Sequence, residues 1–260
     1  MTGTSNDNNE ITTEEDPPPS DYFEQERNNI NRSTLPVPKS NTVYATKDYW
    51  EERFATEKDY EWLMSYQQLA AQLTPYLQAN TRILMVGCGN SPFSADLYDA
   101  GYTNIVNIDY SETVIAAMKA RHDIARPKME WRVMDMTDLS DLSDTSFDVV
   151  IDKATMDALL STEGDVWNPE RSCIDQARAM CAHVSRILKL GGHFLQISLA
   201  QPHFRKIYLL GWHGNPDADR ADASYSAEFE WSCRVDTANK STQDACFGHF
   251  FYVLTKTTRS

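Results

Sequence analysis

The sequence predicts an α/β fold in which helices cover both faces of a mostly parallel sheet. Apolar runs of strand length alternate with helical stretches through the middle of the chain, which is typical of a doubly wound sheet. The first apolar run leads through a glycine turn into a helix, as such sheets require at a ligand site. The last two runs have no helix between them, which indicates an antiparallel hairpin at one edge of the sheet.

Residues 1–40 predict a disordered acidic tail. They combine acidic and polar side chains with the run Pro17-Pro18-Pro19 and few large apolar residues. Such a segment buries too little surface to offset the entropy of ordering the chain. It could act as a docking arm or be inert. Residues 41–260 then form one domain with one sizeable core.

Two amphipathic helices are expected before the first strand. Trp50 and Phe54 lie four residues apart in a helix that begins near Lys47. A second helix is predicted from Tyr60, carrying Trp62, and it is limited by Pro75. Aromatic stripes at this spacing usually face a core, but a segment preceding the first strand can also fold over a ligand at the strand ends. The sequence therefore predicts an N-terminal helical cap.

A glycine turn follows the first predicted strand, Ile83–Val86. Gly87 and Gly89 lack a Cβ, so the chain can turn sharply and bring bare backbone against a ligand. Ser91-Pro92 then begins a helix, which Gly101 ends. Strand, glycine turn and helix start together predict a nucleotide-type cradle.

Acidic residues end the next strands of the predicted sheet. Asp109 closes the strand Ile105–Ile108, about 20 residues past Gly89, where folds of this kind place a carboxylate on ribose hydroxyls. Asp135 and Asp152 end the third and fourth strands in the same way. Because carboxyl ends of parallel strands border one crevice, these acids are expected to converge on a ligand, although each could instead cap a helix. The predicted third and fourth strands are Met129–Met134 and Phe147–Ile151.

The second half of the chain completes the sheet. Ser111 caps a helix, and residues 138–146 form a loop. A long helix over Glu170–Lys189 is ended by Gly191-Gly192 and followed by a fifth strand and a polar loop containing His203. The fifth strand and the two strands of the hairpin, which a long polar connection joins, are His193–Leu199, Glu228–Val235 and His249–Lys256.

Composition restricts the class of protein. No apolar stretch reaches the roughly 20 residues of a membrane span, and the polar segment Met1–Glu10 does not resemble a signal peptide. The five cysteines show no paired spacing, so we expect neither disulfides nor a metal site, and a reducing, cytoplasmic location. The net charge of −14 disfavours nucleic acid as a partner and suits a basic protein, although it could serve solubility alone. The oligomeric state is left open.

Several segments together resemble class I S-adenosylmethionine-dependent methyltransferases, which have a Rossmann-like, seven-stranded sheet. The resemblance covers about residues 47–256 and is most specific for the branch containing the elongation factor 1-alpha lysine methyltransferases. A Gly-Cys-Gly-Asn-Ser loop and an Asp-Lys-x-Thr-x-Asp-Ala-Leu sequence after the fourth strand are its most specific parts. The segments that carry the resemblance are Asp48–Phe54, Val86–Ser91, Asn107–Ser111, Phe147–Leu159 and Pro202–Arg205.

The resemblance implies S-adenosylmethionine as cofactor and a role for each matching residue. It implies that Gly87, Gly89 and Lys153 lie at the methionine end of the cofactor and that Asp109 binds the ribose hydroxyls. It further implies that the remaining residues contact the adenine or fold over the cofactor; these are Tyr110, Asp135 and Met136 at the adenine, and Trp50, Phe54 and Trp62 from the N-terminal segment.

Elementary chemistry agrees with parts of this assignment. Aromatic faces such as those of Trp50 and Phe54 stabilise a sulfonium cation, and a carboxylate accepts strong hydrogen bonds from two hydroxyls. Lys153 is less readily explained, since a cation beside a sulfonium needs neutralising by the ligand carboxylate or by Asp152. Lys153 could otherwise be a surface lysine paired with Asp152.

The sequence departs from the family at two positions. Phe54 replaces an expected tyrosine, and Ser91 stands where many methyltransferases have a third glycine, as is usual in this branch. The implied activity is methylation of a lysine of elongation factor 1-alpha, with the proton acceptor unassigned between Asp157 and His203. Alternatives are a small-molecule methyltransferase, a catalytically silent cofactor-binding module, and a nicotinamide or flavin dehydrogenase. Pro92 stands where a dehydrogenase needs its third glycine.

Overall fold

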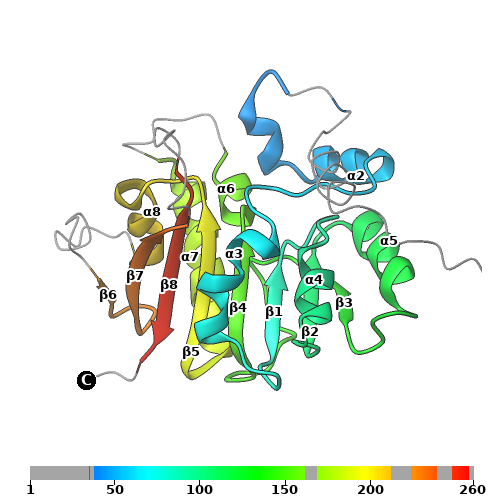
Figure 1. The fold of residues 1–260 in the computed structure, drawn as a ribbon. Helices are drawn as coiled ribbons and strands as arrows, with labels where there is room; N and C mark the ends of the chain where they lie inside the picture. Colours follow the sequence, from blue (N-terminus) through cyan, green and yellow to red (C-terminus); the bar gives the residue numbers. More distant parts are fainter. Residues whose placement is uncertain (1–34, 36–37, 162–168, 212–223, 239–247, 258–260) are drawn as a thin grey trace, which may run out of the picture.

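The computed structural model is built around one eight-stranded sheet with the strand order β3-β2-β1-β4-β5-β8-β7-β6 (Figure 1). It describes residue 35 and residues 38–161, 169–211, 224–238 and 248–257. The strands from β3 to β5 run parallel, and β8, β7 and β6 continue the sheet antiparallel. The strands are β1 (Ile83–Val86), β2 (Ile105–Asp109), β3 (Glu130–Val133), β4 (Phe147–Lys153), β5 (Leu188–Ser198), β6 (Tyr225–Ser226), β7 (Trp231–Thr237) and β8 (Phe250–Lys256).

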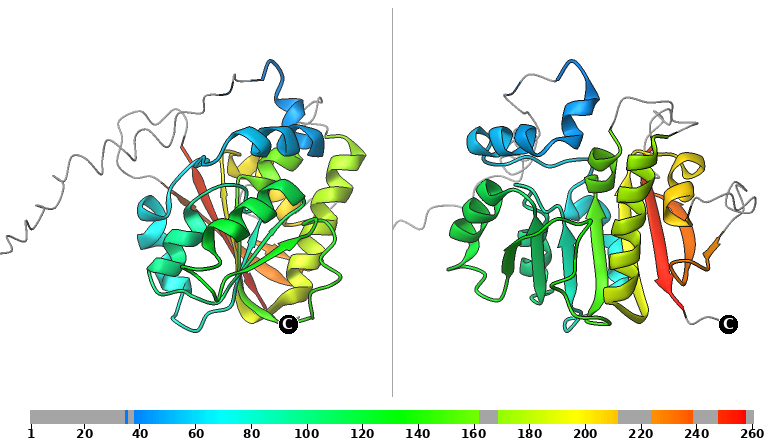
Figure 2. Two further views of the ribbon diagram at one scale, coloured as in Figure 1. Left: turned by 90° about the vertical axis from the view of Figure 1, so that its right-hand side faces the viewer. Right: turned by 180° about the vertical axis from the view of Figure 1, so that it is seen from behind.

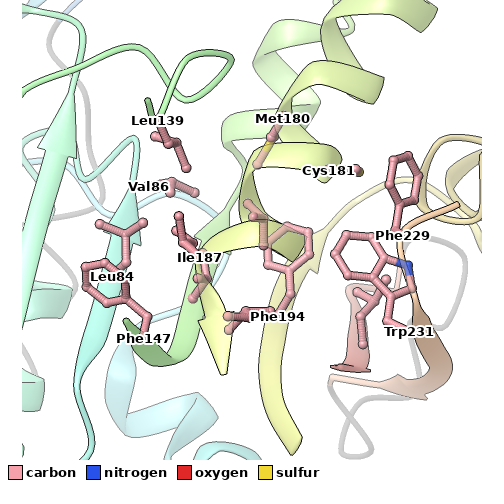
Figure 3. Close-up of a cluster of buried hydrophobic side chains, with 14 of the residues drawn as sticks. Leu84, Val86, Leu139, Phe147, Met180, Cys181, Ile187, Phe194, Phe229 and Trp231 are labelled. Carbon is pink, nitrogen blue, oxygen red and sulfur yellow. The ribbon is translucent and has the colours of Figure 1, made fainter. Parts of the chain in front are cut away.

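Helices cover both faces of the sheet, as expected of a doubly wound fold (Figures 1 and 2). One apolar cluster joins α3, α4 and α5 to one face. A second joins α7 to the other face, and Figure 3 shows Leu84, Phe147, Ile187 and Phe194 packed within it. The helices are η1 (Asn41–Ala45), α2 (Lys47–Thr56), α3 (Tyr66–Leu73), η2 (Thr74–Tyr76), α4 (Phe93–Asp99), α5 (Glu112–His122), α6 (Thr155–Leu159), α7 (Arg171–Ile187) and α8 (Pro202–Leu209).

The strand order places the switch point of the fold between β1 and β4. From β1 the chain first adds β2 and β3 on one side and then returns to add β4 and β5 on the other. A crevice therefore forms at the carboxyl ends of β1 and β4, where the helical connections diverge to opposite faces. The N-terminal helix α2 lies above the same edge of the sheet, on the side of β2 and α5 (Figure 1).

The predicted fold class is confirmed, including the antiparallel edge, with the two-residue β6 added to the seven predicted strands. The predicted tail of residues 1–40 falls almost wholly outside the described residues, as does most of the connection between β7 and β8. The disorder of that tail stays a prediction.

Three predicted elements were wrong. The second cap helix does not begin at Tyr60 but at Tyr66, where Ser65 and Gln68 form a capping box, so Trp62 lies in an irregular segment. The long helix ends at Ile187, and Gly191-Gly192 lie inside β5 instead of closing that helix. The polar loop containing His203 is helical, because Pro202 occupies the first turn of α8.

Candidate functional site

A cavity of about 380 Å³ opens at the carboxyl ends of the parallel strands. Its wall is contributed in sheet order by residues that follow β3, β2, β1, β4 and β5, with the N-terminal segment on top. This volume lies within the roughly 300–1,000 Å³ of small-molecule sites. The cavity wall includes all ten residues predicted to bind the cofactor, namely Trp50, Phe54, Trp62, Gly87, Gly89, Asp109, Tyr110, Asp135, Met136 and Lys153.

The two glycines of the turn are needed for different reasons. Both have positive φ, +58° at Gly87 and +52° at Gly89, a conformation that other residues adopt with strain. A Cβ on Gly87 would also lie 2.2 Å from the Cγ2 of Thr155, whose hydroxyl donates to the Val86 carbonyl. A Cβ on Gly89 would meet only the Phe54 ring, at 3.5 Å. Gly87 thus allows the turn to pack against α6, and Gly89 keeps bare backbone at the cavity.

Asp109 is fixed by backbone donors at the end of β2. Its Oδ2 accepts from the Gly89 amide and its Oδ1 from the Ser111 amide, each at 3.0 Å. The carboxyl is buried, and this burial raises its pKa to about 6, although both amide hydrogen bonds oppose the rise. A carboxylate in this position can still accept hydroxyl hydrogen bonds on its remaining lone pairs.

Tyr110, Asp135 and Met136 line the cavity beyond Asp109. Burial and the neighbouring Asp109 and Asp135 raise the pKa of the Tyr110 phenol. Lys47 of α2 places its Nζ 5.9 Å from the centroid of the Tyr110 ring. Asp135 accepts from both the amide and the hydroxyl of Thr137, which holds the turn after β3. This end of the cavity therefore offers an aromatic face beside a polar edge.

Aromatic side chains of the N-terminal segment close the cavity from above. Trp50 stacks on Phe54 with ring centroids 5.5 Å apart, and Trp62 meets Trp50 edge-on at 5.8 Å. Arg53 packs against this cluster, because its guanidinium carbon lies 5.0 Å from the centroid of the Trp62 ring. The same guanidinium forms an ion pair with Glu57. Trp62 thus lines the cavity from an irregular segment, where its ring contacts Trp50 and Arg53.

Lys153 is buried and forms an ion pair with Glu61. Its Nζ also donates to the Trp62 carbonyl at 2.9 Å, and the Ser91 hydroxyl donates to the same Glu61 oxygen at 2.9 Å. Burial raises the pKa of Glu61, an effect that Lys153 opposes. The alternative of a surface lysine paired with Asp152 is wrong, because Glu61 neutralises Lys153 and ties the Trp62 segment to β4.

Asp152 does not join the other carboxylates at the cavity. It is fully buried, accepts from Gln196 at 2.7 Å, and caps α6 through the Thr155 amide at 2.8 Å. Burial raises its pKa to about 6. The expectation that three strand-terminal acids converge therefore holds for Asp109 and Asp135 only. Asp152 takes the capping role left open as its alternative.

The cavity extends past Lys153 to side chains with no predicted binding role. Asp157 of α6 and Leu199 after β5 line this region, together with Tyr44, Ser161 and Gln176. Asp157 was considered only as a proton acceptor, and the other candidate, His203, does not line the cavity. The sequence could have indicated that Asp157 lies at the cavity, because this residue belongs to the family-like segment Asp-Lys-x-Thr-x-Asp-Ala-Leu at the end of β4.

The described residues contain no group of three or more His, Cys, Asp or Glu placed to hold a metal ion. Their four cysteines are free and buried. No described helix has both the length and the apolar character needed to cross a membrane.

Comparison with known proteins identifies relatives of this chain. A family described as a methyltransferase domain matches residues 84–196. The eEF1A lysine and N-terminal methyltransferase of Bos taurus is 44% identical over 172 residues, 65% of this chain but only 24% of that protein. EEF1A lysine methyltransferase 4 of Mus musculus is 33% identical over 223 residues, 85% of this chain and 79% of that protein.

A solved structure shares the fold. The N-methyltransferase NodS from Bradyrhizobium japonicum, in complex with S-adenosyl-L-homocysteine, superimposes with a TM-score of 0.54 at 14% identity, covering 84% of this chain and 99% of NodS. The match along most of the murine relative is the finding that assigns the family. This chain belongs to the class I S-adenosylmethionine-dependent methyltransferases, in the branch of the eEF1A lysine methyltransferases.

Proposed function

We propose that this protein methylates lysine side chains of elongation factor 1-alpha, using S-adenosylmethionine. The observation that carries the proposal is the 33% identity to an EEF1A lysine methyltransferase over 79% of that protein's length. The cavity supports it, because all ten residues expected to hold the cofactor line its wall. The chain spans about a quarter of the length of the eEF1A lysine and N-terminal methyltransferases that it matches.

The residues present fit the cofactor. Asp109 can accept the ribose hydroxyls, because its carboxylate lines the cavity and is already oriented by two backbone amides. Tyr110, Asp135 and Met136 would then surround the adenine. Trp50 and Phe54 offer aromatic faces to a sulfonium, a contact that stabilises a desolvated cation by about 2 kcal/mol. When bound, S-adenosylmethionine supplies a methyl group on a positively charged sulfur, which an amine nitrogen can displace in line.

Lys153 would lie at the methionine end without repelling the sulfonium. Its charge is offset by Glu61, and both side chains are about 5% exposed. The pair thereby removes the difficulty that a lone buried lysine would create beside a cationic cofactor.

The lysine acceptor must lose a proton before transfer. Neutralising a lysine of ordinary pKa at pH 7 costs about 4.6 kcal/mol. An apolar channel lowers that cost, because desolvation disfavours the ammonium. Precise placement of the amine in line with the methyl group can contribute on the order of 7–11 kcal/mol more. The protein's task is therefore to desolvate and align one amine.

The charge of the whole chain supports a basic protein substrate. A net charge of −14 attracts a cationic surface over several ångströms and favours encounter with a basic translation factor. We also infer a cytoplasmic location, since elongation factor 1-alpha acts in translation.

Mass spectrometry of purified elongation factor 1-alpha tests the proposal. Incubation with this protein and isotopically labelled S-adenosylmethionine should add labelled methyl groups to a lysine, and Gly87→Arg should abolish the labelling. Label found only on small metabolites in a cell extract would instead identify a small-molecule methyltransferase. An absence of any label despite cofactor binding would identify a silent module.

A further inference from the structure

We propose that Asp157 binds and orients the acceptor amine, and that Arg205 and Ser198 position its carboxylate. This inference rests on the proposed function, and names the group that receives the lysine. It starts from a carboxylate in the cavity wall that the predicted cofactor contacts leave unused.

The cavity has two regions along the sheet edge. The predicted adenosine contacts follow β1, β2 and β3, whereas Asp157, Ala158 and Leu159 of α6 lie after β4, and Leu199 follows β5. A cofactor that occupies the first region leaves the α6 side for the acceptor. Leu199 is 53% exposed although it lines the cavity, so it marks the opening toward solvent.

One oxygen of Asp157 is held and the other is free. Oδ1 accepts from the Ser198 hydroxyl at 2.7 Å and from Arg205 Nη2 at 2.5 Å. Oδ2 is buried and has no hydrogen-bond partner among the described residues. A buried carboxylate oxygen without a donor is costly, and in a cavity wall it is a site for a donor that arrives with a ligand.

Arg205 is suited to holding this carboxylate in place. It is only 2% exposed and its ion pair with Asp157 joins α8 to α6. A buried guanidinium fixes the direction of a carboxylate more firmly than a solvent-exposed lysine does. The second oxygen of Asp157 can therefore keep its orientation before the acceptor enters.

A primary amine on a long apolar stem fits this arrangement. Leu159, Leu199 and Tyr44 line the same cavity as Asp157, so apolar surface for the stem and a carboxylate for the amine occur together in its wall. An ammonium entering this region would pair with Oδ2, lose one proton through Asp157 to water, and present its lone pair. That lone pair forms the new N–C bond as the C–S bond breaks, and the electrons of the C–S bond remain on the sulfur.

The carboxylate stabilises the transfer itself as well as binding. Positive charge moves from the sulfur to the nitrogen during the reaction, so a fixed negative charge beside the nitrogen gains interaction energy as the transition state forms. Asp157 should consequently affect kcat for the protein substrate and leave the affinity for cofactor nearly unchanged.

The test compares Asp157→Asn with wild type and with Asp175→Asn, a matched change at an exposed position of α7. We expect Asp157→Asn to lower kcat/KM for elongation factor 1-alpha about 100-fold, and to weaken its binding to the S-adenosylhomocysteine-loaded protein about tenfold. The affinity for S-adenosylhomocysteine should stay close to that of wild type, whereas the melting temperature should fall because Arg205 loses its charge partner. If Arg205 left unpaired prevents folding, Asp157→Asn with Arg205→Met removes both charges and should show the same loss.

A folded Asp157→Asn variant with wild-type kcat/KM would overturn the proposal. So would a loss of activity fully matched by a loss of S-adenosylhomocysteine affinity, which indicates a purely structural role. If wild type fails to label elongation factor 1-alpha, the proposed substrate is refuted, but the proposed role of Asp157 is not. Wild type and Asp157→Asn are then compared by incubation with cell extract. In that extract, wild type should label protein lysines and Asp157→Asn should not. If neither protein labels a lysine, both the lysine methyltransferase function and the role of Asp157 are refuted.

Discussion

The proposed contact of Asp109 with the ribose makes cofactor binding depend on the protonation of this carboxyl, which lines the cavity. Its pKa is raised to about 6 by burial, so the free protein is partly protonated there at mildly acidic pH. Ribose hydroxyls stabilise the carboxylate form, which means that binding must expel this proton. Affinity for S-adenosylhomocysteine should therefore fall about tenfold between pH 7 and pH 5.

Calorimetry in buffers of different ionisation enthalpy measures the proton directly. Near pH 6 about half a proton should be released per ligand bound, and almost none at pH 8. Asp109→Asn is the control, since it should bind weakly with no proton release from this position. Equal proton release from wild type and Asp109→Asn would show that another group is responsible.

At the level of elements, Glu51 is the side chain of α2 that hydrogen-bonds to the start of α5, beside the contacts of Lys47 with Tyr110 and of Phe54 with the core. Glu51 accepts from the Ser111 hydroxyl at 2.9 Å and from the Glu112 amide at 3.0 Å, at the start of α5. These hydrogen bonds lower the pKa of Glu51 although partial burial opposes them. A carboxylate at a helix N-terminus is also favoured by the helix dipole. Glu51 thereby sets the position of Trp50 and Phe54 over the cavity.

Removing Glu51 should loosen this cap. We expect Glu51→Ala to destabilise the protein by about 1 kcal/mol, as the loss of a helix cap does, and to weaken cofactor binding several-fold. Thermal melting and calorimetry measure the two effects. The exposed neighbour Glu52 provides the matched control Glu52→Ala, which should change neither. Identical behaviour of both variants would mean that α2 is held by its aromatic contacts alone.

Most elements of the fold could be predicted because their signals are local. Apolar runs identified the buried parallel strands β1, β2, β4 and β5, and the glycine turn located the switch point. The segment before Tyr66 was mispredicted since its apolar spacing is helical, whereas Leu63 has φ of +62° and the Trp62 carbonyl accepts from Lys153, 91 residues away. Tertiary contacts of this kind leave no local pattern. Helix α6, with five residues, is too short for periodicity to detect.

The site was predicted less from local pattern than from resemblance. Strand-end geometry alone selects Gly89 and Asp109, but it selects Asp152 equally, and that residue faces the core. The turn that follows the strand decides whether a strand-terminal acid faces the cavity or the core. After β4, this turn brings the Thr155 amide of α6 to Asp152. Glu61 was missed because its function depends on its pairing with Lys153, far away in the sequence.

On the scale of the whole molecule, the net charge of −14 should act on the protein substrate and much less on a neutral ligand. Attraction between extended surfaces is screened as the Debye length shortens from about 10 Å at 0.1 M salt to about 3 Å at 1 M. Contacts inside the cavity are shielded from that screening. Salt should therefore reduce encounter with elongation factor 1-alpha while the site itself continues to bind.

Raising sodium chloride from about 50 mM to about 500 mM should lower kcat/KM for elongation factor 1-alpha about tenfold or more, mainly through KM. The Kd for S-adenosylhomocysteine, which carries no net charge, should change less than about twofold over the same range because its contacts are desolvated. Stopped-flow or steady-state kinetics and calorimetry give the two values. A kcat/KM independent of salt would mean that the acidic surface serves solubility and that the substrate is recognised by short-range contacts around the cavity opening.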